Sequence, residues 1–84
     1  MYFTYCKIFP LQGQLNQERI VRNCKLEKAK LVREGFDVEL KYYPAKTRRK
    51  KVTYIRLETR LSPLLQPSTL FLLEEKGFKL ANIN

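Results

Sequence analysis

Residues 36–59 constrain the fold most, because they combine two alternating segments with a polar connection. The arms, residues 36–43 and 52–59, alternate apolar and polar side chains and are rich in β-branched and aromatic residues. The connection opens with Pro44, so the sequence predicts a β-hairpin with one core face and one charged face. A register with Tyr43 opposite Val52 pairs Lys41 with Tyr54, Glu39 with Arg56 and Asp37 with Glu58 on one side, and Leu40 with Ile55 and Val38 with Leu57 on the other.

Residues 2–9 predict another strand, since they are aromatic and β-branched and end at Pro10. The pattern does not decide which side of this strand points toward the core. Lys7, as a charged residue, favours the facing in which its own side of the strand points outward. In that facing Thr4, Cys6 and Ile8 point inward, while Phe3, Tyr5, Lys7 and Phe9 point outward.

Two helices are predicted, over residues 16–34 and 68–76. Asn16 is a candidate N-cap for the first, whose apolar residues fall on one face, and Gly35 is a stop signal after it. The second helix starts near Ser68 and stops at Gly77. The last seven residues fit a short strand.

The resulting order of elements is β, α, β, β, α, β, which predicts a ferredoxin-like α+β fold with both helices on one face of a four-stranded antiparallel sheet. Both helices end with a glycine followed by a phenylalanine that leads into a strand. In this topology the first and third strands form the central pair. A chain of 84 residues can bury one modest core, so residues 1–84 are expected to form a single domain.

The chain is strongly basic, with 17 Lys and Arg against eight Asp and Glu, a net charge of +9. On so small a body this charge favours acidic polymers as partners. The excess is uneven, because residues 36–60 carry eight positive and three negative side chains. We therefore expect nucleic acid, RNA or single-stranded DNA, as the partner, with the hairpin as its contact.

Two cysteines and no histidine argue against a structural zinc site, and no other cofactor is expected. Cys6 and Cys24 are interpreted as reduced, buried residues of a cytoplasmic protein, although a disulfide between them is the alternative. No apolar run approaches the length of a membrane span, and the first residues do not resemble a signal peptide. We expect a soluble protein without membrane contacts.

Enzymatic signals are weak. Histidine is absent, the carboxylates lack the paired spacing of a metal or glycosidase site, and the three glycines form no phosphate loop. The remaining enzymatic hypothesis is a histidine-free ribonuclease. Its candidate residues would be Arg48, Arg49, Tyr54 and Arg56.

The connection of the hairpin carries five cations within six residues, here called the basic tip: Lys46, Arg48, Arg49, Lys50 and Lys51. Such a cluster can contact phosphates at several points and gain affinity from counterion release. The alternative is a solvated hairpin whose charges only prevent edge-to-edge aggregation. The density of charge and the adjacent tyrosines favour binding.

Tyrosines beside the basic tip suggest stacking on bases. Residues 50–57 resemble the third-strand octamer of RNA recognition motif domains in their basic start, in Tyr54 and in Ile55, although Lys51 and Val52 replace residues of that pattern. The resemblance implies that bases stack on the open sheet face, with Tyr5 as the first-strand aromatic. The predicted nucleic-acid-binding residues are the basic tip together with Arg56, Tyr5, Tyr43 and Tyr54. The alternative is that Tyr5 and Tyr54 only pack on sheet neighbours.

A structural or interaction role is the rival hypothesis. An accessory subunit or homodimer would bury the open face, including Tyr2, Phe3, Tyr5 and Tyr43, against another protein. Aromatic residues with arginine are typical of interface anchors. The sequence leaves this choice open.

Overall fold

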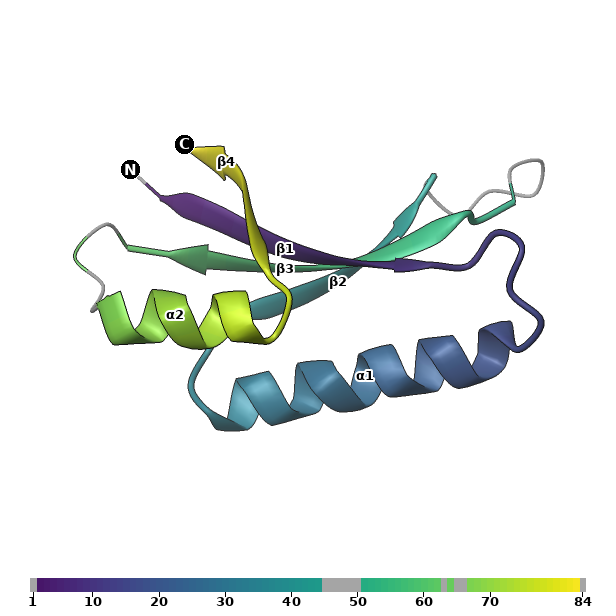
Figure 1. Cartoon of the computed structure of the whole chain (residues 1–84), viewed down its shortest axis with the longest axis horizontal. Helices are drawn as coiled ribbons and strands as arrows, with labels where there is room; N and C mark the ends of the chain where they lie inside the picture. Colours follow the sequence, from purple (N-terminus) through teal and green to yellow (C-terminus); the bar gives the residue numbers. More distant parts are fainter. Residues whose placement is uncertain (1, 45–50, 63, 65–66, 84) are drawn as a thin grey trace.

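The computed structural model describes residues 2–44, 51–62, 64 and 67–83, and it has the predicted ferredoxin-like architecture. Both helices cover the same face of one four-stranded antiparallel sheet, whose strand order is β2-β3-β1-β4 (Figure 1). The elements in chain order are β1 (Phe3–Pro10), α1 (Gln17–Arg33), β2 (Val38–Tyr43), β3 (Tyr54–Leu61), α2 (Pro67–Glu75) and β4 (Lys79–Ile83).

β1 and β3 form the central pair, as predicted. They run side by side from Phe3 opposite Leu61 to Pro10 opposite Tyr54. β2 and β4 are the edge strands. Within the described residues, neither helix is long and apolar enough to cross a membrane.

Both predicted helix ends are correct to within a residue or two, because local signals determine them. The side-chain oxygen of Asn16 accepts a hydrogen bond from the Arg19 N–H at 3.2 Å, which caps α1. Gly35 (φ +96°) and Gly77 (φ +93°) take the left-handed conformation after the two helices. The following Phe36 and Phe78 each return a backbone N–H to a leucine carbonyl inside the helix, both at 3.0 Å.

The core lies between the sheet and the helices. Cys24 and Leu31 enter it from α1 and Leu73 from α2, all with no exposed surface. The sheet contributes the buried residues Tyr5, Val38, Ile55, Leu57 and Leu61, and Phe78 joins them from the connection between α2 and β4.

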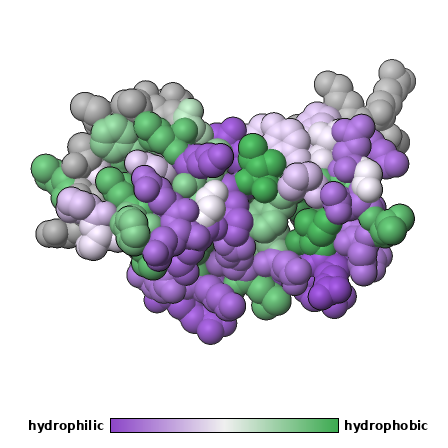
Figure 2. Space-filling view, in the orientation of Figure 1, coloured by the Kyte–Doolittle hydropathy of each residue, from purple (hydrophilic) through white to green (hydrophobic). Residues whose placement is uncertain are grey.

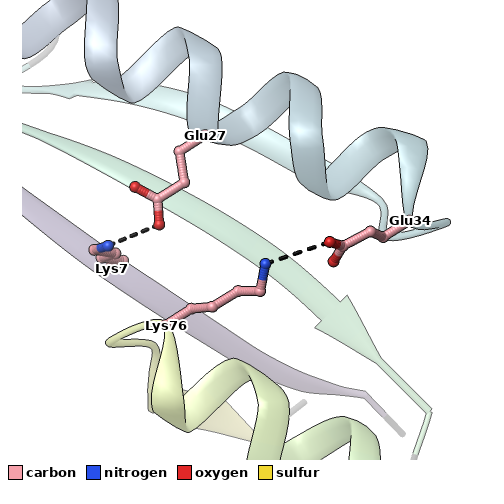
Figure 3. A network of polar contacts seen from close by, with 4 residues as sticks. All are labelled: Lys7, Glu27, Glu34 and Lys76. Carbon is pink, nitrogen blue, oxygen red and sulfur yellow. Dashed lines mark hydrogen bonds and ion pairs between the residues drawn. The ribbon is translucent and has the colours of Figure 1, made fainter.

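The facing of β1 that Lys7 favoured is wrong. Tyr5 and Lys7 lie opposite the buried Thr59 and Leu57, so the side of β1 that carries Phe3, Tyr5, Lys7 and Phe9 faces the helices. Lys7 is accommodated there because its ammonium forms an ion pair with Glu27 of α1 at 2.7 Å (Figure 3). The partner comes from an element 20 residues away, so the strand pattern alone did not reveal it.

The hairpin register also differs from the prediction, by two residues. Tyr43 faces Tyr54 rather than Val52, and Leu40 faces Leu57 rather than Ile55. Thr53 closes the end of the ladder, since its N–H and its hydroxyl both donate to the Tyr43 carbonyl, at 2.8 and 3.1 Å. A shift by two residues leaves every side chain on its predicted face, because side chains alternate with a period of two.

Both cysteines are free, as predicted. Cys24 is fully buried among core residues, and Cys6 is half-buried on the other face of the sheet. Burial, with the Glu27 charge nearby, raises the pKa of the Cys24 thiol to about 11.

Thiol titration is therefore expected to distinguish the two cysteines. At pH 8 a disulfide reagent should react with Cys6 first, whereas Cys24 should react only as fast as the protein opens, since it has little thiolate and no access to solvent. Unfolding in denaturant should bring the total to two equivalents. A native disulfide, seen as no free thiol after unfolding, would contradict this assignment.

Candidate nucleic-acid interface

The face of the sheet opposite the helices presents its side chains in rows that run across β1, β3 and β2. The pairing registers define these rows, because residues directly opposite each other in antiparallel strands project to the same side. Starting beside the basic tip, they are the aromatic row (Pro10, Tyr54, Tyr43), the cationic row (Ile8, Arg56, Lys41) and the acidic row (Cys6, Glu58, Glu39).

The aromatic row contains a stacked pair. The rings of Tyr43 and Tyr54 are 5.1 Å apart between centroids and only 6° from parallel. Both side chains are half-buried. A directly opposed aromatic pair of this kind stabilises a hairpin and holds both rings in a fixed orientation.

Two cations of the cationic row form ion pairs with a carboxylate of the acidic row. Nε of Arg56 lies 2.8 Å from Oε1 of Glu58, and Nζ of Lys41 lies 2.8 Å from Oε2 of the same carboxylate. The Arg56 guanidinium also lies over the Tyr43 ring, 5.7 Å from its centroid. Arg56 is therefore held by two neighbours, and its charge is largely compensated.

Glu58 is the centre of this network. Its side chain is only 11% exposed, and it accepts a 3.4 Å hydrogen bond from the Tyr43 hydroxyl in addition to its two cations. Burial raises the pKa of Glu58, but the Lys41 hydrogen bond and the Arg56 and Lys41 charges outweigh burial and hold it below its ordinary value. The same contact raises the pKa of Lys41. Glu58 thus orients Tyr43, Arg56 and Lys41 together.

Replacing Glu58 with glutamine is expected to destabilise the protein by about 1 to 2 kcal/mol at pH 7, because two cations lose their shared carboxylate. Glu39→Gln is the matched control. Its carboxylate is 58% exposed and lies 3.7 Å from Lys41, so the loss should stay within about 0.5 kcal/mol. Chemical denaturation measures both changes.

The effect of Glu58 should depend on pH. A carboxyl group whose pKa is lower in the folded protein stabilises it at pH values above the ordinary glutamate pKa, and this stabilisation disappears as the pH falls through the folded value. The difference between parent and Glu58→Gln should accordingly shrink below pH 4.3 or so, the ordinary value. A difference that is constant from pH 7 to pH 3 would contradict the ion-pair account.

The basic tip joins the sheet next to the aromatic row. Lys46, Arg48, Arg49 and Lys50 lie outside the described residues, whereas Lys51 is described and exposed. β2 ends at Tyr43 and β3 begins at Tyr54. Residues 44–53, which contain the basic tip, therefore connect the two stacked tyrosines. The five cations therefore lie between the two stacked tyrosines along the chain, and Lys51 is three residues before Tyr54.

Tyr5 does not belong to this surface. It lies on the helix-covered side of β1 and is only 9% exposed, with the sheet between it and the stacked tyrosines. The placement implied by the RNA recognition motif resemblance is therefore wrong for this residue. β1 instead contributes Cys6, Ile8 and Pro10 to the open face, of which Ile8 is 54% exposed.

The open face is not uniformly basic. Glu39 and Glu58 balance Lys41 and Arg56, and Asp37 and Arg60 lie beside them. The alternation of Arg56 and Glu58 on one side of a strand was a signal for this compensation that the charge count did not capture. The charges of the open face are therefore largely balanced, and the positive excess of residues 36–60 comes mainly from the basic tip.

Comparison with family models, with curated proteins and with solved structures gave no match for this chain. In the described part of the chain, no three cysteine or carboxylate side chains gather closely enough to hold a metal ion. Of the residues suspected for a ribonuclease, Tyr54 and Arg56 occupy adjacent rows, and the other two, Arg48 and Arg49, belong to the basic tip outside the described residues.

Proposed function

We propose that this protein binds single-stranded nucleic acid, RNA or DNA, with little sequence preference. The observation that carries the proposal is the stacked Tyr43–Tyr54 pair on a helix-free sheet face, at the junction with the basic tip. Aromatic rings beside a track of cations are the usual means by which proteins hold single strands. A base that stacks on the pair extends it by one ring, while the tip contacts phosphates.

The two contributions should differ in their response to salt. Phosphate contacts release counterions, so their part of the affinity falls steeply with added salt. Stacking releases none. A duplex is a poorer fit for the aromatic row, because its bases are already stacked and paired.

Tyr54→Ala is expected to weaken binding of a short mixed-sequence single strand by roughly 5- to 150-fold, the loss of one base stack worth about 1 to 3 kcal/mol. The slope of affinity against salt should stay nearly unchanged. Tyr54→Phe keeps the ring and should bind like the parent. Fluorescence anisotropy of a labelled strand, repeated over a salt series, measures both quantities.

Tyr2→Ala is the matched control for these variants. Tyr2 is 56% exposed and precedes Phe3, at the end of β1 remote from Pro10 and Tyr54, so its removal should leave binding unchanged. Equal affinity of Tyr54→Ala and the parent would remove the aromatic row from the interface. If Tyr54→Ala instead dissociated a protein complex, the open face would be a protein interface.

For the accessory-subunit hypothesis, the open face offers fewer of the four expected anchor residues than the sequence suggested. Phe3 and Tyr5, two of its four anchors, face the helices. Tyr43 remains on the open face, and Tyr2 is exposed at the start of β1. Because two of the four anchors of a protein interface face the helices, nucleic-acid binding is the preferred function.

A further inference from the structure

α1 carries a second basic surface, on the side of the helix that faces solvent. Arg19, Arg22, Lys30 and Arg33 follow each other at spacings of three, eight and three residues, and Leu26 lies four residues from both Arg22 and Lys30, which puts all five on one stripe. All five residues are exposed. We call the four cations the α1 stripe. Figure 2 shows a predominantly hydrophilic surface over α1.

Two of the carboxylates on or beside α1 are engaged with cations of other elements, whereas Glu18, in the first turn, is exposed one helical turn from Arg22. Glu27 pairs with Lys7 of β1 at 2.7 Å, and Glu34, which follows the helix, pairs with Lys76 after α2 at 3.4 Å (Figure 3). Among the described residues, none of the four stripe cations forms an ion pair with a carboxylate. Another carboxylate, Glu75 of α2, lines the same hollow as Lys30, so the stripe keeps an excess of positive charge over Glu18 and Glu75.

The α1 stripe lies on the opposite side of the molecule from the aromatic row. The buried Cys24 and Leu31 fix the inner side of α1 against the sheet, so the stripe points away from it. From Arg19 to Arg33 the helix rises about 21 Å. A strand held on the open face by Tyr43 and Tyr54 could not reach these cations without passing around the sheet.

We propose that the α1 stripe binds the phosphate backbone of a second nucleic-acid segment, so that one protein molecule bridges two segments. This inference rests on the proposed function for the first segment. The chemistry fits phosphates, since exposed arginines and lysines along a rigid helix contact a backbone without reading its sequence. A membrane surface fits less well, because the apolar side of α1 is buried against the sheet and only Leu26 interrupts the stripe.

A sandwich assay tests bridging directly. One single-stranded oligonucleotide is immobilised, a second carries a fluorophore, and protein is added below the concentration of immobilised strand. The parent should retain the labelled strand. The stripe variant, in which Arg19, Arg22, Lys30 and Arg33 become glutamine, should retain roughly 10-fold less or lower, while its affinity for one dilute strand changes little.

Two further variants separate this proposal from the proposed function. The tip variant replaces Arg48, Arg49, Lys50 and Lys51 with glutamine and has the same net charge as the stripe variant, +5 instead of +9. It should also fail to bridge. Glutamine is as good a helix former as arginine, and circular dichroism checks the fold. Should the fourfold change disturb α1, Arg22→Gln with Arg33→Gln should still lose part of the bridging.

Each outcome has a definite meaning. Bridging by the stripe variant at the parent level would overturn the second surface. Undiminished bridging by the tip variant would instead overturn the proposed function of the hairpin. If the parent bound vesicles of phosphatidylcholine and phosphatidylserine, and the stripe variant lost this binding while it still bridged, the stripe would be a membrane contact and the proposal would fall.

Discussion

Phe78→Ala is expected to lower the free energy of unfolding by about 3 to 5 kcal/mol. The side chain is 1% exposed and packs in the core directly after the glycine that ends α2. Its removal would leave a cavity between the sheet and α2 that the surrounding residues cannot fill completely. For a domain of 84 residues the total stability is about 4 to 13 kcal/mol, so this variant loses a large fraction of it.

Phe71→Ala is the matched control, because it makes the same chemical change seven residues earlier in the chain. Phe71 projects from α2 into solvent and is 63% exposed. Its replacement should change the stability by no more than about 0.5 kcal/mol. Equal losses for the two variants in urea denaturation would mean that the core is not where the structure places it.

The tip variant, Arg48, Arg49, Lys50 and Lys51 to glutamine, should have the largest effect on binding. For a single strand each phosphate contact contributes about 0.7 to the slope of log affinity against log salt, so four lost contacts flatten this slope by roughly 3. Extrapolated to 50 mM salt, the loss of affinity reaches the order of 10³-fold. Anisotropy titrations over a salt series measure both values.

A charge-conserving exchange controls for the loss of side-chain shape. Arg48→Lys with Arg49→Lys keeps both positive charges and should keep the slope of the parent, because counterion release depends on charge. A tip variant that bound single strands as tightly as the parent would show that the hairpin is not the site.

The fold was predictable where local signals act alone. Asn16, Gly35 and Gly77 fix the helix ends through hydrogen bonds within a few residues, and the order of elements follows from them. The facing of β1 was not predictable, because Lys7 is stabilised on the core side by Glu27 from another element. The hairpin register depends on how Thr53 binds the Tyr43 carbonyl. The alternation of apolar and polar residues does not predict this contact.

The candidate site was likewise predictable only in part. Alternation correctly put Tyr43, Tyr54 and Arg56 on the open face, and the structure adds that the two rings stack. Tyr5 was misplaced together with its strand. The role of Glu58 was missed, since its alternation with Arg56 signals one ion pair but not the contacts with Lys41 and Tyr43, which come from the neighbouring strand.

Photocrosslinking identifies the side chains on which a bound base stacks. A single-stranded RNA that contains 5-iodouridine is bound to the parent protein and irradiated, which links the base to an aromatic ring stacked against it. Mass spectrometry of the digest then identifies the residue. Crosslinks are expected at Tyr54 or Tyr43, in the aromatic row. Crosslinks confined to Tyr2 or to other residues away from this row, at saturating RNA, would contradict it.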